Sequence, residues 1–235
     1  MGAVQLKNFK ELDYGAREAI NTLCTNLSFA GGDIRKIIVT SYRPSEGKSF
    51  VSMNLMRAFA NISRRVLLID ADLRGSVLRY EYAIEAQDTY LSGLTRYLAG
   101  KCAVESIVQS TNIANADIIL SGRTVSNSLP LINSERMKAL FDYTDGKYDI
   151  VIVDAPPVGT IIDAAKIAAY CDGTLYVVES GVETQQELRD GLQQMERAGS
   201  TVLGIVLNKY QTNPDKYYDY YSDHLYAKRK KASKP

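Results

Sequence analysis

The stretch Gly47-Lys48-Ser49 stands where a phosphate-binding loop would stand, between an apolar run and a helical pattern. In such a loop, backbone N–H groups and the N-terminus of the following helix point at phosphate oxygens. Lys48 would neutralise the β- and γ-phosphates, and the Ser49 hydroxyl would ligate Mg²⁺. The full pattern has Gly five residues before Gly47, where this chain has Tyr42, so an ordinary strand-to-helix turn is the alternative. The predicted nucleotide contacts of this segment are Ser45, Glu46, Gly47, Lys48, Ser49 and Phe50.

Carboxylates follow two further apolar runs. VLLIDADLR places Asp70 and Asp72 directly after one run, and YDIVIVDAPP places Asp154 after another. Each Asp taken alone is typical of a turn or a helix cap. Three carboxylates at the rim that carries a phosphate loop are harder to explain that way, because Mg²⁺ prefers oxygen ligands and substrate phosphates. Together these residues predict a nucleoside-triphosphate site with a hard cation.

Asn208 ends the last apolar run, LGIVLNK. Its amide carries both a donor and an acceptor and can pair with the edge of a base. A strand-terminating Asn explains the residue equally well. The sequence alone does not distinguish between these two interpretations.

The elements that must position these residues alternate between strand and helix. Apolar runs occur at Lys36–Thr40, Val66–Ile69, Asp117–Leu120, Ile150–Val153, Thr174–Val178 and Val202–Leu207. The runs are continuous rather than alternating, which is typical of strands covered on both faces. Apolar residues at helical spacing separate them, so we predict an α/β fold with a doubly wound, mainly parallel sheet. A helix is expected at 16–29, and short helices are expected within 75–116.

The periodic pattern stops after Asn208, which divides the chain into a domain at 1–209 and a tail at 210–235. The tail reads YYDYYSDHLY and then AKRKKASKP. Buried Tyr hydroxyls need partners, and the aromatic stretch lacks the Val and Ile that would build a core around the rings. The polar residues between the rings predict a solvated, accessible and flexible segment.

Composition narrows the class of protein. The net charge of the 235 residues is +1, so no global charge suggests a nucleic-acid partner. Cys24, Cys102 and Cys171 show no metal-ligand or disulfide spacing, which suits a reducing compartment. Neither a signal peptide nor a run long enough to span a bilayer is recognisable, so a soluble cytoplasmic protein is expected.

A phosphate loop without its first Gly, then LLIDADLR, then IVIVDAPPV, resembles the bacterial tyrosine kinases (BY-kinases). More narrowly, the chain is similar to the cytoplasmic kinases of capsular and exopolysaccharide systems in Gram-positive bacteria, from about Glu18 to the tail. The resemblance implies a P-loop NTPase fold with Walker A, A′ and B motifs. It also implies a non-specific protein-tyrosine kinase that uses ATP and Mg²⁺ and phosphorylates its own tail in trans. The acceptors would be Tyr217, Tyr218, Tyr220, Tyr221 and Tyr226.

The resemblance also implies partners. These are other copies of the chain in a ring-shaped homo-oligomer, a membrane-spanning polysaccharide co-polymerase adaptor, and a cognate tyrosine phosphatase. The adaptor would activate the kinase and recruit it to the inner face of the plasma membrane. Phosphorylation would then regulate the synthesis and export of the polysaccharide.

The motifs assign roles by position. Lys48 and Ser49 match the phosphate-loop lysine and the Mg²⁺ hydroxyl. Asp70 and Asp72 match the second motif, in which the first Asp is the base or a metal ligand. Asp154 matches the third motif, whose Asp acts on Mg²⁺ largely through water. The implied catalytic set is Lys48, Asp70, Asp72 and Asp154, and the implied metal set is Ser49, Asp70 and Asp154.

The chain departs from the family pattern at several positions. Ser45 stands where the family usually has Gly. In the oligomerisation helix Glu18 is retained, whereas Asn21 and Cys24 replace two Arg residues. The segment at 126–128 reads Ser-Asn-Ser where many relatives have Pro-Asn-Pro.

Two other functions remain open. Arg43 lies five residues before Lys48, where partition-type ATPases have their signature Lys, so an ATPase switch of the partition or septum-site type is the main alternative. Such a switch has no need of clustered C-terminal Tyr, which favours the kinase. A non-catalytic nucleotide-binding scaffold for the polysaccharide machinery is the third possibility.

Overall fold

The computed structural model describes residues 2–31, 34–86 and 93–210. The tail at 211–235, with its predicted acceptor tyrosines, lies outside the described residues, and the boundary at 209 stays a prediction. The strands are β1 Gly2–Leu6, β2 Lys36–Ser41, β3 Val66–Asp70, β4 Ile84–Ala86, β5 Gln109–Ser110, β6 Ala116–Ile119, β7 Ile150–Asp154, β8 Gly173–Glu179 and β9 Val202–Asn208. The helices are α1 Tyr14–Phe29, α2 Lys48–Asn61, α3 Leu78–Glu81, α4 Leu94–Leu98, α5 Leu129–Ile132, α6 Glu135–Thr144, α7 Asp163–Ala168 and α8 Gln185–Arg197, with a 3₁₀ turn at Val104–Ser106.

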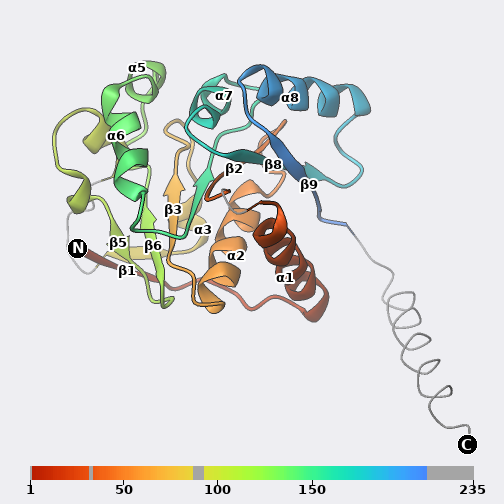
Figure 1. Ribbon diagram of the computed structural model, residues 1–235, viewed down its shortest axis with the longest axis horizontal. Helices are drawn as coiled ribbons and strands as arrows, with labels where there is room; N and C mark the ends of the chain where they lie inside the picture. Colours follow the sequence, from red (N-terminus) through yellow and green to blue (C-terminus); the bar gives the residue numbers. More distant parts are fainter. Residues whose placement is uncertain (1, 32–33, 87–92, 211–235) are drawn as a thin grey trace, which may run out of the picture.

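The strands form a single sheet in the order β4-β1-β5-β6-β3-β7-β2-β8-β9 (Figure 1). From β6 to β9 every neighbouring pair is parallel. The antiparallel pairs, β1 with β4 and β5 with β6, lie toward the other end of the sheet. The prediction of an α/β fold with a doubly wound, mainly parallel sheet is confirmed.

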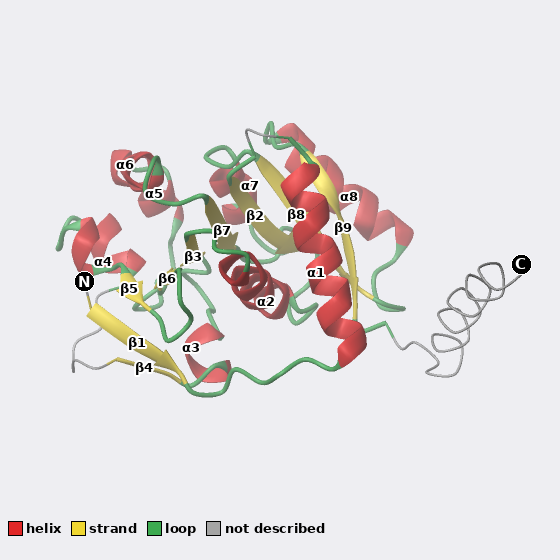
Figure 2. Ribbon diagram, turned by 60° about the horizontal axis from the view of Figure 1, so that its bottom comes forward, coloured by secondary structure: helices red, strands yellow, loops and turns green. Residues whose placement is uncertain are grey.

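Helices cover both faces of the sheet, as Figure 2 shows. Ile37 and Val39 of β2 pack in the apolar cluster that includes α1, α2 and α3. Ile38, between them, packs in the cluster that includes α4 to α8. Since successive side chains of a strand point to opposite faces, burial on both sides requires an apolar residue at every position. This is why the central strands appear in the sequence as unbroken apolar runs.

The six strands predicted from apolar runs are all present, with ends within two residues of the predicted ones. The region 75–116 contains the expected short helices, and in addition the strands β4 and β5. The strand β1 was not predicted. It pairs with β5 in parallel and with β4 in antiparallel orientation, so its partners lie far along the chain. No helix in the described part of the chain has the length and apolarity needed to cross a membrane.

The first helix, α1, begins two residues earlier than predicted because the Asp13 carboxylate accepts a hydrogen bond from the Ala16 N–H at 2.8 Å. Cys24, which replaces a family Arg, is buried against the core. Asn21, at the other replaced position, is exposed and donates to Glu18 Oε1 at 3.4 Å. The Cys24 thiol therefore contributes packing where an arginine would contribute charge.

The carboxyl ends of the parallel strands share one edge of the sheet. Asp70 ends β3, Asp154 ends β7 and Asn208 ends β9. Asp70 and Asp154 lie opposite each other on adjacent strands. Ligands bind beyond this edge in open α/β sheets, so the predicted site residues gather where the fold places its binding sites.

Candidate active site

The segment before α2 has the conformation of a tight phosphate-binding loop. Gly47 caps the helix with φ 95°, which favours Gly. A Cβ at this position would lie 1.9 Å from Asn208 Nδ2, so the close approach of the last strand also requires Gly. Ser45 has φ 64°, a left-handed conformation that is strained for a residue with a side chain. The loop thus adopts the conformation expected of its motif even where Ser replaces the family Gly.

A cavity of about 1040 Å³ opens beside this loop, and we call it the donor cavity. Its size suits a nucleotide-sized ligand. Most of the residues predicted from the sequence line it: Ser45, Gly47, Lys48, Ser49, Phe50, Asp72, Asp154 and Asn208. The fully buried Glu46 and Asp70 do not line it. The structure therefore brings together three predicted elements, which are the loop, one Asp of the second motif and the Asp of the third.

Asp154 is held on the floor of the donor cavity by two hydroxyls of α2. Ser49 Oγ donates to one carboxylate oxygen at 2.6 Å, and Ser52 Oγ donates to the other at 3.0 Å. Burial raises the pKa of Asp154 to about 6, although the Ser49 hydrogen bond and the charge of Lys48 oppose the shift. The contact joins the hydroxyl and carboxylate that the motifs assign to Mg²⁺.

Lys48 is buried at the start of α2, with 8% of its surface exposed. Burial lowers the pKa of its ammonium group, and the carboxylates of Asp154 and Asp72 oppose that shift. Phosphate oxygens in the donor cavity would add further negative charge beside the desolvated ammonium group. The environment of Lys48 is therefore suited to an anionic ligand.

Asp70 lies behind Ser76, away from the donor cavity. Its Oδ2 accepts hydrogen bonds from Ser76 Oγ and from the Ser121 N–H, the latter at 3.2 Å. Its Oδ1 is buried and has no hydrogen-bond partner among the described residues. Burial raises the pKa of Asp70 to about 7, and the nearby charge of Asp154 adds to the shift. A carboxylate with a pKa near 7 and one unpaired oxygen has the properties of a general base.

Asp72 shapes the loop that follows β3. Its Oδ1 accepts from the N–H groups of Arg74 and Gly75 at 3.1 and 2.8 Å. Arg74, which also lines the donor cavity, donates through Nε to Ser128 Oγ and forms an ion pair with the buried Asp163. Ser128, at the position of a family Pro, also donates to Asp163. Asp72 is therefore held within its own loop, and Arg74 is fixed at the cavity by contacts with two separate segments.

Whether these residues can hold Mg²⁺ depends on which of their oxygen atoms can act as ligands. Within residues 2–31, 34–86 and 93–210, no group of three or more His, Cys, Asp or Glu is arranged to hold a metal ion. The predicted carboxylates therefore do not form a complete metal site by themselves. Mg²⁺ is commonly bound through one or two carboxylates, water and substrate phosphates. Ser49 and Asp154, both oxygen donors on the cavity floor, fit that pattern.

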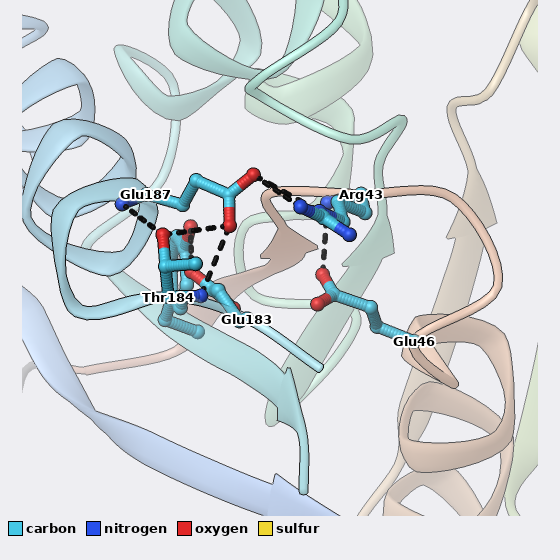
Figure 3. Close-up of polar contacts among 6 residues, drawn as sticks. Arg43, Glu46, Glu183, Thr184 and Glu187 are labelled. Atoms are coloured by element: carbon cyan, nitrogen blue, oxygen red, sulfur yellow. Dashed lines mark hydrogen bonds and ion pairs between the residues drawn. The ribbon is translucent and has the colours of Figure 1, made fainter. Parts of the chain in front are cut away.

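A second layer of charged groups supports the phosphate loop from behind (Figure 3). Glu46 Oε2 accepts from the Arg43 N–H at 2.8 Å, and the Arg43 guanidinium contacts Glu187 Oε1 at 2.5 Å. Glu187 closes a capping box with Thr184, whose N–H together with Arg43 lowers the pKa of Glu187 to about 2. Burial and the charge of Glu46 raise the pKa of the neighbouring Glu183 to about 7. The Glu46 side chain thus supports the loop, and a nucleotide contact by this residue stays a prediction.

The last strand fastens the loop from its other side. Asn208 Nδ2 donates to the Glu46 carbonyl at 2.9 Å. Lys209 Nζ donates to the Ser45 carbonyl at 2.8 Å and forms an ion pair with Glu179. The side-chain N–H of Asn208 is therefore bonded within the chain, although Asn208 also lines the donor cavity. Base recognition by Asn208 stays a prediction.

Sequence reasoning missed the side chains that hold the motif residues in place. Ser52, Ser76, Ser121 and Asp163 carry no recognisable motif. Ser52 lies three residues after Ser49, one helical turn onward, so its position on the same face of α2 could have indicated a contact. The others come from distant segments, and no local signal could have indicated them.

Comparisons with known proteins agree with this geometry. The AAA domain family AAA_31 matches residues 34–201. The tyrosine-protein kinase CpsD of Streptococcus pneumoniae is 34% identical over 211 residues, which cover 89% of this chain and 92% of that protein. The crystal structure of the chimerical protein CapA2B2 has a TM-score of 0.80 at 28% identity, covering 90% of this chain and 94% of that one. The kinase domain of Escherichia coli tyrosine kinase ETK has a TM-score of 0.75 at 32% identity, covering 84% and 78%.

A septum-site protein shares the fold at greater distance. The septum-site determining protein MinD of Pyrococcus horikoshii, solved with Mg-ADP, is 23% identical with a TM-score of 0.61, covering 79% of this chain and 76% of that one. At this identity the likeness shows the P-loop NTPase fold alone. The specific matches are to tyrosine kinases, over almost the whole of the chain and of the relative. The chain therefore belongs to the AAA domain family and, within it, to the bacterial tyrosine-protein kinases.

Proposed function

We propose that this protein-tyrosine kinase is an autokinase that transfers the γ-phosphoryl group of ATP to the tyrosines at 217–226 of another copy. One observation carries the proposal. Lys48, Ser49 and Asp154 line one cavity at the carboxyl edge of the sheet, and the buried Asp70 lies opposite Asp154 on the next strand. The residues that would stabilise the charge of a phosphoryl donor therefore lie next to Asp70, which would act as the base for a hydroxyl acceptor.

The transfer requires one bond to form and one to break. The phenolic oxygen of the acceptor forms a bond to the γ-phosphorus while the bond from that phosphorus to the ADP oxygen breaks, and ADP leaves with the bonding electrons. The phenolic proton passes to the Asp70 carboxylate. The transition state is loose, so positioning and neutralisation of charge provide most of the catalysis. The Lys48 ammonium group and the backbone N–H groups at the start of α2 serve that purpose.

Ser49 and Asp154 would hold Mg²⁺ together with the phosphates, and the bound ion would supply charge neutralisation for the transferred group. Asp72 acts through the loop after β3, because its carboxylate fixes the N–H groups of Arg74 and Gly75. Arg74 is held at the cavity by Asp163. These residues position the groups that contact the nucleotide.

The biological setting is proposed from the same relatives. Tail phosphorylation would regulate capsular or extracellular polysaccharide synthesis and export. A membrane-spanning co-polymerase adaptor would activate the kinase at the inner face of the plasma membrane, a tyrosine phosphatase would reverse the reaction, and a homo-oligomer would bring tails to neighbouring sites. Support comes from the names of the kinases that the chain resembles and from the chimerical CapA2B2 structure.

Mass spectrometry of the tail after incubation with ATP and Mg²⁺ tests the proposal. The experiment is run with and without the cytoplasmic end of the adaptor, because the isolated kinase can require activation. We expect phosphate on several of the five tyrosines Tyr217, Tyr218, Tyr220, Tyr221 and Tyr226. Absence of phosphotyrosine under both conditions would contradict the proposal.

The ATPase-switch alternative receives no support from Arg43. That residue pairs with Glu187 of its own chain and does not line the donor cavity. Release of inorganic phosphate from ATP without any phosphotyrosine would nevertheless favour the switch. The two products are measured in the same reaction, so the alternatives are separated directly.

A further inference from the structure

Two carboxyl groups come into contact behind the phosphate loop, and we call them the glutamate pair (Figure 3). Glu46 belongs to the loop itself, and Glu183 lies in the segment between β8 and α8. Glu46 is fully buried and does not line the donor cavity, and Glu183 is half-buried. No motif described above accounts for the contact between these two side chains.

Each carboxyl group of the pair has one oxygen with a partner and one without. Glu46 Oε2 accepts from the Arg43 N–H at 2.8 Å, and Glu183 Oε1 accepts from the Tyr176 hydroxyl at 3.2 Å. The other two oxygens, Glu46 Oε1 and Glu183 Oε2, are buried and have no hydrogen-bond partner among the described residues. Buried polar atoms are nearly always hydrogen-bonded, and an unpaired one is costly. A single proton shared by the two groups would give both oxygens a partner.

The charged groups around the glutamate pair do not neutralise it. The Arg43 guanidinium group donates to Glu187 of α8, through Nε at 3.1 Å and through a terminal nitrogen at 2.5 Å. Three carboxyl groups, those of the pair and of Glu187, therefore act on one guanidinium group, which is bonded to the third of them. Tyr176 of β8 also faces the pair, and burial raises the pKa of its hydroxyl, which stays neutral.

Full ionisation of the pair would bring two negative charges into contact in a buried site. Two carboxylates that share a site cannot both ionise easily, so the pKa of one is raised. Burial and the charge of Glu46 raise the pKa of Glu183 to about 7. The pair therefore holds about one proton below neutral pH and loses it as pH rises above 7.

The pair lies close to the place where phosphate groups bind. Glu46 stands between Ser45 and Gly47, which both line the donor cavity, and its charge acts on the buried Lys48. Electrostatic effects are strong in such a buried region. A negatively charged ligand in the cavity favours the form of the pair that carries less negative charge. By linkage, the proton should in turn favour the ligand by the same factor.

We propose that Glu46 and Glu183 share one proton behind the phosphate loop, and that nucleotide binding in the donor cavity promotes uptake of this proton from solvent. Glu183 is then a positioning residue: when protonated it donates to Glu46, which holds the Arg43 N–H at the start of the loop. Loss of the proton leaves two carboxylates that repel each other and weakens the binding of phosphate groups. Because it concerns nucleotide binding, this coupling goes beyond the proposed phosphorylation of the tail and does not require it.

Isothermal titration calorimetry of the full-length kinase with ADP measures the coupling without turnover. Titrations at pH 7 in buffers with different enthalpies of ionisation give the number of protons taken up on binding. The unmodified kinase should take up about 0.4 proton more than Glu183→Gln, the value for a coupling of about tenfold. The amide keeps the shape of the side chain and can still donate to Glu46, so it removes the exchange of the proton and retains the support of the loop.

Differences between variants isolate the glutamate pair. Asp70, Asp154 and the phosphates of ADP also exchange protons near neutral pH, and they do so in every variant. The matched control Glu196→Gln changes an exposed carboxyl group of α8 and should take up as many protons as the unmodified kinase. Glu46→Gln removes the other member of the pair, so it should lose the same uptake, and the double variant should lose no more.

The affinity for ADP provides a second readout. At pH 8.5 the Kd of the unmodified kinase should exceed that of Glu183→Gln by about eightfold, and at pH 6 the two should be nearly equal. Mg²⁺ should reduce the difference, because it neutralises part of the charge of ADP. Equal proton uptake and a parallel pH dependence of Kd in the two proteins, as expected if a water molecule bridges two ionised carboxylates, would overturn the proposal.

The same measurements separate this coupling from the proposed function. If no phosphotyrosine forms and the uptake differs as expected, tail phosphorylation fails while the shared proton stands. If phosphotyrosine forms and the uptake is the same in both proteins, the shared proton is wrong and the autokinase stands.

Discussion

The two cavities that meet at Ser76 are built in different ways. The donor cavity takes its main polar groups from three short stretches at strand ends, each with a recognisable spacing. The second cavity, of about 590 Å³ on the other side of Asp70, takes its cations from Arg79, Lys101 and Arg123, which no motif connects. A phosphate chain has a fixed geometry and needs a loop of fixed conformation, whereas the cations of the second cavity come from segments that only the fold brings together. The first kind of site can be predicted from sequence motifs, whereas the second can be recognised only in the folded structure.

Removing the buried cation of the donor cavity should have the largest effect. Lys48→Met leaves the phosphates without their main protein counter-charge, so we expect phosphotyrosine formation to fall about a hundredfold or more. Quantitative phosphotyrosine blotting of equal amounts of folded protein measures it. The matched control is Lys138→Met on the exposed surface of α6, which should keep full activity. Full tail phosphorylation by Lys48→Met would show that the donor site is assigned wrongly.

Asp70→Asn tests whether the carboxylate between the cavities serves the acceptor. The amide keeps the shape of the side chain and removes the base, so we expect kcat to fall roughly 10²- to 10⁴-fold while ATP affinity stays unchanged. Single-turnover kinetics and nucleotide titration separate the two quantities. Loss of ATP binding together with kcat would instead assign Asp70 to the donor cavity.

The carboxyl groups behind the phosphate loop predict opposite pH effects (Figure 3). The pKa of Glu183 is raised from 4.5 to about 7 by burial and by Glu46, so the unfolded chain loses this proton at lower pH than the folded chain. The contribution of Glu183 to stability therefore falls as pH rises from about 4.5 to about 7. Glu183→Gln removes that loss, so its stability relative to the unmodified protein should increase from pH 4.5 to 7.

Glu187, close to Glu183, is the matched comparison. The Thr184 N–H and Arg43 lower its pKa from 4.5 to about 2, so its contribution is present above pH 4.5 and is lost as pH falls toward 2. Glu187→Gln should therefore destabilise the protein at neutral pH, and the deficit should shrink on acidification. Urea unfolding of both variants across this range measures the trends. Parallel stability curves for the variants and the unmodified protein would contradict the assignment.

The smallest effect is expected where the loop departs from its family. Ser45 has φ 64°, and a left-handed conformation costs a non-glycine residue about 1–2 kcal/mol. Gly relieves that cost, but its greater backbone freedom stabilises the unfolded state by about 0.4–1 kcal/mol, which opposes the gain. Ser45→Gly should thus raise the free energy of unfolding by about 1 kcal/mol or less, measured by urea denaturation. A clear loss of stability would mean that the Ser45 side chain makes a contribution of its own.

The sequence predicted the parts of the fold that depend on local pattern. Six strands with two buried faces follow from unbroken apolar runs, and the loop before α2 follows from Gly47, Lys48 and Ser49. The strands β4 and β5 were missed because they are only three and two residues long. The strand β1 was missed because it lacks a continuous apolar run and depends on pairing with distant segments. Local reasoning fails where long-range pairing determines the structure.

The site shows the same division. The positions of Lys48, Ser49 and Asp154 around one cavity agree with their motifs. The nucleotide contact predicted for Glu46 stays a prediction, and the sequence did not indicate that the buried side chain of Glu46 accepts from the Arg43 N–H. The sequence also could not show that Asp70 and Asp72, which lie two residues apart, line different cavities. The direction of a loop side chain depends on tertiary contacts that spacing does not encode.

Transfer from one copy to another is the central claim, and a mixing experiment measures it most directly. One chain carries Lys48→Met with its tail intact, and the other carries an intact donor site with its five tail tyrosines changed to Phe. After incubation with ATP and Mg²⁺ and the adaptor segment, phosphate should appear on the tail of the Lys48→Met chain, as read by mass spectrometry. No phosphate on that tail, while an unmodified chain phosphorylates itself under the same conditions, would contradict transfer between copies.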